Sequence, residues 1–130
     1  MLYIIAIILL LVLDAIWISL NLARYKKLVY DVQKSQLTVR FIPACIAYIL
    51  MVVGLLVFVL PQVQKSKNKL QTSIKYGGLY GLTVYGIFNA TNAAMFKNYD
   101  AMTATFDTLW GTALFVLTPY LASIISQRLF

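Results

Sequence analysis

The sequence contains no histidine and no glutamate, and it has a single cysteine, Cys45. Without histidine there is no His-based nucleophilic catalysis, no HExxH metalloprotease motif and no usual switch near physiological pH. A lone cysteine forms no internal disulfide and does not build a structural zinc site. Because of these absences, an enzyme is the least favoured function class. We expect no cofactor and predict no particular metal.

Charge is also scarce, because only 12% of the residues are charged while 62% are hydrophobic. A typical soluble domain is about half apolar and about 25% charged. A soluble fold of 130 residues could not bury so much apolar surface, whereas a bilayer accepts it. We therefore expect one integral membrane domain that occupies residues 1–130.

The apolar residues gather in four runs, at about residues 1–22, 41–60, 75–96 and 104–125. A helix of about 20 residues crosses a hydrocarbon core of about 30 Å, and backbone groups in lipid must bond within their own helix. The predicted fold is all-α, a four-helix transmembrane bundle with up-down topology. This multi-pass arrangement puts both termini on one side and leaves the kind of membrane open.

Prolines and the N-terminus refine these spans. Met1–Leu13 is apolar but has no preceding basic residue and no small-residue cleavage site, which indicates a retained first span. Pro43 suits the first turn of the second helix, Pro61 is expected to close that helix, and Pro119 is expected to kink the fourth.

The connection from Arg24 to Arg40 is long enough for a helix of its own. Residues at helical spacing, namely Tyr25, Leu28, Val29, Val32 and Gln36, would form one face of it. This pattern favours a short helix that lies in the interface or extends the first span, and a solvated basic loop is the alternative.

The net charge of +7 comes from eleven basic residues that lie almost entirely between the apolar runs. That placement favours contact with the lipid bilayer and its anionic headgroups over nucleic-acid binding. The predicted headgroup contacts are Arg24, Lys26, Lys27 and Arg40. The two sides of the predicted bundle carry similar numbers of basic residues. Basic residues follow the first span and none precede it, which favours a cytoplasmic location for the connection between the first and second spans. The sequence leaves open whether the protein forms a homo-oligomer or joins a larger membrane assembly.

Polar residues inside the predicted spans are the most informative feature. Asp14 and Asp107 are carboxylates in hydrocarbon, which are costly and usually mark a functional site. Helical spacing and depth along three spans place a set of side chains at one end of the bundle. The predicted site residues are Asp14, Trp17, Asn21, Asn89, Asn92, Asp107 and Trp110.

Several ligands fit such a polar pocket. Two carboxylates and amide oxygens suit a small cation or a proton that is bound or passed across the membrane, as in a transporter or channel. With Arg24 and Arg40 nearby, the same residues suit a zwitterion or a polar headgroup. The alternative is a structural membrane protein in which the polar side chains join helices by hydrogen bonds, and Asp107 also complements a helix N-terminus.

Weaker patterns concern packing. Gly77 and Gly81 form a G-x-x-x-G pattern, which indicates close helix packing within the molecule. The tyrosines Tyr76, Tyr80, Tyr99 and Tyr120 are interpreted mainly as belt or packing aromatics.

Four motifs together resemble a family of small four-span membrane proteins of unknown function. They are Asp14-Ala15-Ile16-Trp17, Gly78-Leu79-Tyr80-Gly81, the stretch from Tyr85 to Ala93, and Asp107-Thr108-Leu109-Trp110-Gly111. The resemblance implies a family found in bacteria, with relatives in algae, protists and large DNA viruses, many of which carry Asp where this chain has Asn89. The resemblance covers nearly the whole chain and implies a four-span fold but no activity. A viral-envelope or complex-assembly component is therefore the structural alternative.

Overall fold

The computed structural model describes residues 1–130, which form helices and no strands. In chain order the elements are α1 (Leu2–Leu20), α2 (Leu22–Gln33), α3 (Phe41–Gly54), the π-helix η1 (Leu55–Val59), α4 (Leu60–Gln64), α5 (Lys69–Thr72), the π-helix η2 (Ser73–Gly77), α6 (Gly78–Met95) and α7 (Ala101–Leu129). The all-α prediction is confirmed.

Three helical segments are long and apolar enough to cross a membrane, namely Leu2–Leu20, Phe41–Gln64 and Ala101–Leu129. The predicted span at residues 75–96 falls on the α5–η2–α6 segment, which ends at Met95 and is not among them. Its glycine, threonine and asparagine residues make this segment less apolar than the other three. The prediction of apolar, membrane-spanning helices is therefore supported for three of the four predicted spans.

Pro61 does not close the second helix, so that prediction is wrong. The helix continues through α4 to Gln64, and the π-helical segment η1 ends at Val59, two residues before the proline. Pro61 has no N–H to donate to the carbonyl four residues earlier, and a wider turn is one way in which a helix accommodates such a break. Pro43 lies in the first turn of α3, as predicted.

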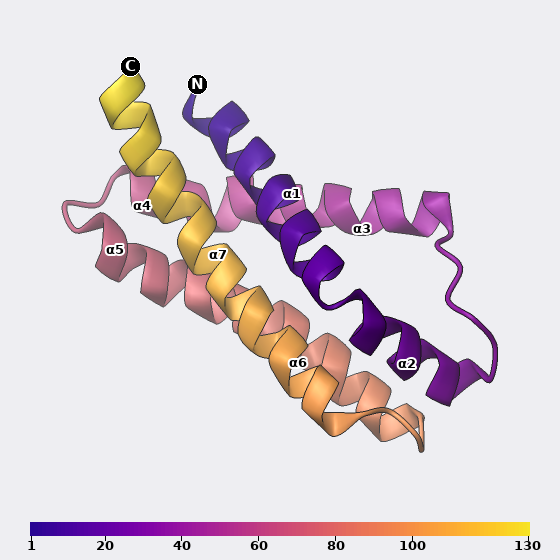
Figure 1. The fold of residues 1–130 in the computed structure, drawn as a ribbon. Coiled ribbons are helices and arrows are strands. Elements are labelled where there is room, and N and C mark those ends of the chain that lie inside the picture. Colours follow the sequence, from indigo (N-terminus) through magenta and orange to yellow (C-terminus); the bar gives the residue numbers. More distant parts are fainter.

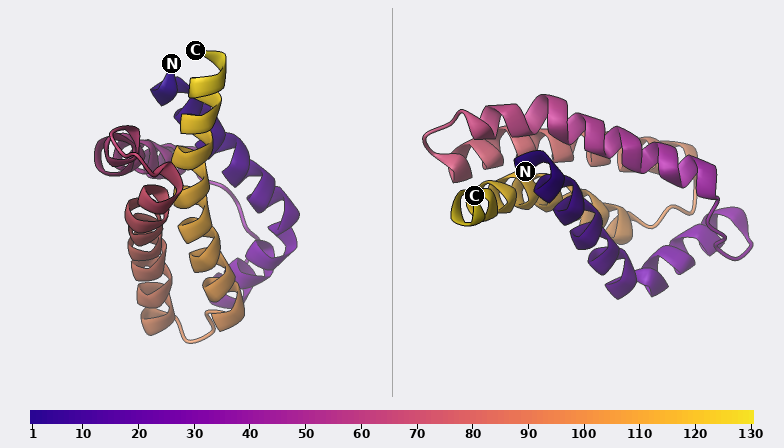
Figure 2. Two further views of the ribbon diagram at one scale, coloured as in Figure 1. Left: turned by 90° about the vertical axis from the view of Figure 1, so that its left-hand side faces the viewer. Right: turned by 90° about the horizontal axis from the view of Figure 1, so that it is seen from above.

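α7 is the central element, and both α1 and α6 pack along it (Figures 1 and 2). The α3–η1–α4 segment crosses behind α1 in Figure 1. The two termini lie close together at one end of the molecule, while the α2–α3 and α6–α7 connections lie toward the other (Figure 1).

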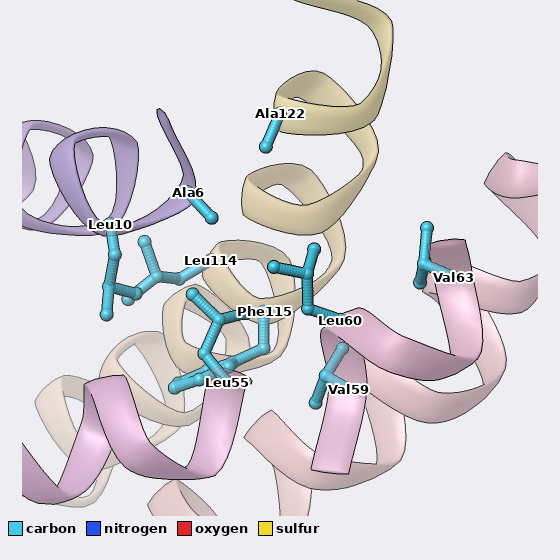
Figure 3. Packing of buried hydrophobic residues seen from close by; sticks show 9 residues of the cluster. All are labelled: Ala6, Leu10, Leu55, Val59, Leu60, Val63, Leu114, Phe115 and Ala122. Atoms are coloured by element: carbon cyan, nitrogen blue, oxygen red, sulfur yellow. The ribbon is translucent and has the colours of Figure 1, made fainter. Parts of the chain in front are cut away.

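The hydrophobic core gathers nine fully buried residues from α1, η1, α4 and α7 (Figure 3). Leu10 of α1, Leu55 of η1, Leu60 of α4 and Phe115 of α7 meet there without solvent exposure. Large apolar side chains also cover the outside, such as Phe41, which is 79% exposed. An outer surface this apolar is compatible with lipid rather than water.

The contact between α6 and α7 depends on glycine. A Cβ atom at Gly81 would clash with the backbone carbonyl of Gly111, and a Cβ at Gly111 would clash with the ring of Tyr85. The G-x-x-x-G pattern therefore serves packing within the molecule, as predicted.

Pro119 lies inside α7, which continues as one helix to Leu129. The proline cannot donate a hydrogen bond to the carbonyl of Phe115. That same carbonyl faces Gly77, where a Cβ atom would clash with it. Because Gly77 has no side chain, η2 can approach the carbonyl of Phe115, which receives no helical hydrogen bond from Pro119.

The helix predicted in the first connection is present as α2. It ends at Gln33, and the C-cap residue Lys34 has a positive φ of 59°, so Gln36 lies outside the helix. The solvated-loop alternative applies only to the residues after Lys34.

Candidate functional site

Asp14 is buried in the middle of the fold, with 5% of its surface exposed. Its Oδ1 accepts a hydrogen bond from Trp110 Nε1 at 2.9 Å, and its Oδ2 accepts one from Tyr48 Oη at 2.6 Å. Asp14 therefore links α1 to α7 and α3. Each of its two oxygens therefore has one hydrogen-bond partner from another helix.

The two tryptophans of the chain lie between the two aspartates. Trp17 and Trp110 stack with ring centroids 4.9 Å apart and planes 4° from parallel. Trp17 Nε1 donates to Tyr25 Oη at 2.9 Å, while Trp110 donates to Asp14. The stacked pair thus joins the surroundings of Asp14 to those of Tyr25.

Asp107, near the start of α7, has its own pair of donors. Its Oδ1 accepts from Tyr25 Oη at 2.6 Å, and its Oδ2 accepts from Asn89 Nδ2 at 2.8 Å. Burial, together with the hydrogen bond to Asp107, raises the pKa of Tyr25 well above its usual value. Tyr25 therefore keeps its proton at neutral pH and remains a donor to the carboxylate.

Asn89 connects α6 to α7 and is almost fully buried, at 4% exposure. Its Nδ2 also lies 3.0 Å from the carbonyl of Tyr85 and 3.1 Å from Thr108 Oγ1. Its Oδ1 accepts from Tyr99 Oη at 2.8 Å, and Asn92 Nδ2 lies 3.5 Å from the same hydroxyl. Asn89 thus has partners for both ends of its amide.

Six of the seven predicted site residues belong to this group of contacts, which we call the polar network. Its members are Asp14, Trp17, Trp110, Tyr25, Tyr48, Asp107, Asn89, Asn92, Tyr99 and Thr108. Asn21 does not take part in it. It lies at the break between α1 and α2, where its Nδ2 donates to the carbonyl of Trp17 at 3.0 Å.

Three tyrosines of the network were not among the predicted site residues. The sequence pattern places Tyr25 on a helical face, favours a belt or packing role for Tyr99, and assigns no role to Tyr48. The available signal at Tyr48 was a hydroxyl in the middle of an apolar span, since a buried tyrosine hydroxyl usually needs a partner.

The predicted headgroup residues have different surroundings. The guanidinium of Arg24 lies 4.8 Å from the ring centroid of Phe106 in a cation–π contact. Lys27 Nζ pairs with Asp31 Oδ2 at 3.0 Å on the exposed face of α2, and this pairing raises the pKa of Lys27. Arg40 lies at the N-cap of α3, and Lys26 lies on α2 with its side chain exposed.

A cavity of about 760 Å³ borders the polar network. Thirteen of its sixteen lining residues are hydrophobic, and they come mainly from α2, α3 and α6. Four of the five residues of the face predicted for this helix line it, namely Tyr25, Leu28, Val29 and Val32.

This cavity differs from the polar pocket predicted from the sequence. Asp107 lines it whereas Asp14 does not, so the two carboxylates do not share one pocket. The structure contains no cluster of three or more His, Cys, Asp or Glu side chains that could hold a metal ion.

Comparison with known proteins adds the family. A family model described as a predicted membrane protein, DUF2177, matches residues 1–124. No curated protein and no solved structure matches the chain. The family match supports the membrane location and leaves the role of the polar network to be argued from its geometry.

Proposed function

Because the chain belongs to the DUF2177 family of predicted membrane proteins, we propose that it is one membrane domain that binds the polar headgroup of an amphipathic molecule dissolved in the bilayer. In this proposal α6 is the fourth span. Its 18 residues, at about 1.5 Å each, extend for about 27 Å, close to the thickness of a hydrocarbon core of about 30 Å. Four spans also agree with termini that lie at one end (Figure 1).

The observation that carries the proposal is the position of Asp107 on the wall of an apolar cavity. Asp107 is the only charged residue that lines it. Ligand sites commonly combine a mainly apolar cavity of about 300–1,000 Å³ with a few polar groups that orient the ligand. The apolar walls would hold a hydrocarbon chain while Asp107, Asn92 and Tyr99 would meet its polar end.

The exposed rim of the cavity supports entry from the bilayer. Leu50 of α3 and Phe88 of α6 line the cavity, yet they are 62% and 57% exposed. Side chains in this position would contact lipid on one side and the ligand on the other. An amphipathic molecule would therefore reach the cavity laterally, without leaving the membrane.

Headgroup binding fits these contacts better than proton or cation passage does. An indole N–H only donates, and Trp17 and Trp110 stack on each other rather than share a hydrogen bond. The hydrogen bonds therefore do not form an unbroken proton path from Asp14 to Asp107. The two carboxylates also engage separate donors and do not converge on one ion.

A structural role is the second candidate, as in a viral-envelope or complex-assembly component. It is favoured by the fact that all four carboxylate oxygens of Asp14 and Asp107 already accept hydrogen bonds from neighbouring helices. In that case the polar network only joins helices, at about 1 kcal/mol or less for each hydrogen bond.

The test uses the two tryptophans as the reporter. Trp17 and Trp110 are the only tryptophans in the chain and lie beside Tyr25, which lines the cavity. Amphiphiles with a brominated chain, titrated into protein in nanodiscs, should quench their fluorescence in a saturable way. Ala47→Phe should fill part of the cavity and weaken this binding about fivefold or more, because a ligand would then overpack the site at a cost of about 1–3 kcal/mol.

Ala90→Phe is the matched control, since Ala90 is an exposed residue of α6 that does not line the cavity. It should bind like the wild type. Quenching that never saturates, or that is identical in all three proteins, would leave the structural role as the better account.

A further inference from the structure

We propose that the ligand of this cavity is a cationic amphiphile, a single hydrocarbon chain that carries an ammonium headgroup bound by Asp107 among aromatic rings. This inference rests on the proposed function and names the class of molecule that the site would take. It follows from the charge of the cavity, from its aromatic walls and from the free acceptor positions of Asp107.

The charge of the cavity is uncompensated. No Lys or Arg is among its lining residues, and the one ion pair of the molecule, between Lys27 and Asp31, lies on the exposed face of α2. A carboxylate that faces an apolar space without a cation is in an unfavourable environment. An ammonium group in the cavity would supply the missing charge.

The walls of the cavity suit an organic cation. Six of its lining residues are aromatic, namely Tyr25, Tyr80, Tyr85, Phe88, Phe96 and Tyr99. The faces of aromatic rings attract cations, and aromatic cages are the usual protein sites for choline-like and methylated ammonium groups. An anionic headgroup would meet both these rings and the carboxylate unfavourably.

Asp107 also has acceptor positions left. A carboxylate offers about four lone-pair positions, and Asp107 uses one on each oxygen, for Tyr25 and Asn89. The remaining positions would accept N–H groups of a primary ammonium without breaking the polar network. Ligand binding would then require no rearrangement of α2 and α6 around Asp107.

A neighbouring cavity does not compete for the same ligand. It measures about 470 Å³ and shares Tyr99, and its charged lining residues are Asp31, Lys34, Lys97 and Asp100. Two acids and two bases balance each other, so this cavity favours an ion of neither sign. The unbalanced charge is that of Asp107.

The experiment compares four probes with one chain length: tetradecylamine, tetradecyltrimethylammonium, tetradecanol and tetradecyl phosphate. Each competes with a brominated amphiphile for quenching of Trp17 and Trp110 in wild-type protein in nanodiscs. The two ammonium probes should bind with an affinity at least about ten times that of tetradecanol. This is the effect expected when a desolvated cation–π contact is combined with a carboxylate. Tetradecyl phosphate should bind most weakly.

Asp107→Asn keeps the size of the side chain and removes its charge. It should reduce the preference for ammonium over tetradecanol to about twofold or less, with little change for tetradecanol itself. Asp31→Asn, which removes a carboxylate outside this cavity, should keep the wild-type preference and so controls for general surface charge.

The outcomes separate the two proposals. If tetradecanol or tetradecyl phosphate binds as tightly as the ammonium probes, the cavity takes amphiphiles but the ammonium inference is wrong. If none of the four probes competes, headgroup binding itself fails. The ranking of probes by the wild type decides the matter even if Asp107→Asn does not fold.

Discussion

At the scale of single residues, Asp14 and Asp107 have similar surroundings but different positions. Each carboxylate accepts one hydrogen bond from a tyrosine and one from an N–H group, supplied by Trp110 for Asp14 and by Asn89 for Asp107. Asp107 alone borders the cavity. Under the proposed function, Asp14 would only join helices, whereas Asp107 would also meet the ligand.

Replacement of Asp14 should separate the need for an acceptor from the need for a charge. In Asp14→Asn the amide oxygen can accept from Trp110 and the amide nitrogen can donate to Tyr48, so we expect a loss of about 1 kcal/mol or less. Asp14→Leu leaves both partners without an acceptor and should lose about 1–3 kcal/mol.

The measurement for Asp14 is the free energy of unfolding in mixed detergent micelles, for the wild type and both variants. Equal losses for Asn and Leu would show that charge, rather than hydrogen-bond acceptance, is what the surrounding helices require.

At the scale of helices, glycines decide how closely α6 approaches α7. The network contacts of Asn89 with Asp107 and Thr108 span these two helices, so their spacing also sets the geometry of the site. Gly81 and Gly111 lie where a Cβ atom would clash with backbone or with the Tyr85 ring. Gly86 lies on α6 together with Gly81, but a Cβ atom at Gly86 would be 3.8 Å from Thr108 Cγ2, which is an ordinary contact.

Alanine substitutions at these glycines should therefore differ in effect. Gly81→Ala and Gly111→Ala should destabilise the protein by about 1–3 kcal/mol, because overpacking forces the helices apart. Gly86→Ala should be neutral or slightly stabilising, since alanine favours a helix over glycine by about 1 kcal/mol. Thermal unfolding in detergent compares the three, and a Gly86→Ala variant as unstable as Gly81→Ala would contradict this account of the packing.

At the scale of the whole molecule, the polar and apolar parts occupy different halves. Along α1 and α7 the core residues Leu10 and Phe115 lie nearer the chain ends than the network residues Asp14 and Trp110. The cavity adds α2 and α3 to that second half. A ligand site would thus lie near one membrane surface.

The proposed four-span topology predicts which connections share a side. Lys27 is in α2 and Lys67 is in the connection between α4 and α5. Single cysteines at these two positions, in a background with Cys45→Ala, should react with a membrane-impermeant thiol reagent from opposite sides. Reaction of both from one side would rule out the topology, and a cysteine-free protein controls for background labelling.

The sequence by itself determined the membrane class, the approximate helices and six residues of the polar network. These features are local, because a span shows as an apolar run and the shared face of Asp14 and Trp17 follows from helical spacing. The amphipathic face of α2 was predictable for the same reason, and its four helical residues line the cavity.

Only the tertiary structure decided which partners each aspartate has and where the cavity lies. Tyr48 and Tyr25 reach Asp14 and Asp107 because of how α3 and α2 cross the α1–α7 pair, and local spacing carries no information about such crossings. The structure also shows that the second helix continues past Pro61 after the π-helical turns of η1, which the apolar run does not indicate. The separation of the two carboxylates into different surroundings, with Asp107 alone on the cavity wall, arises from that packing of helices distant in the sequence.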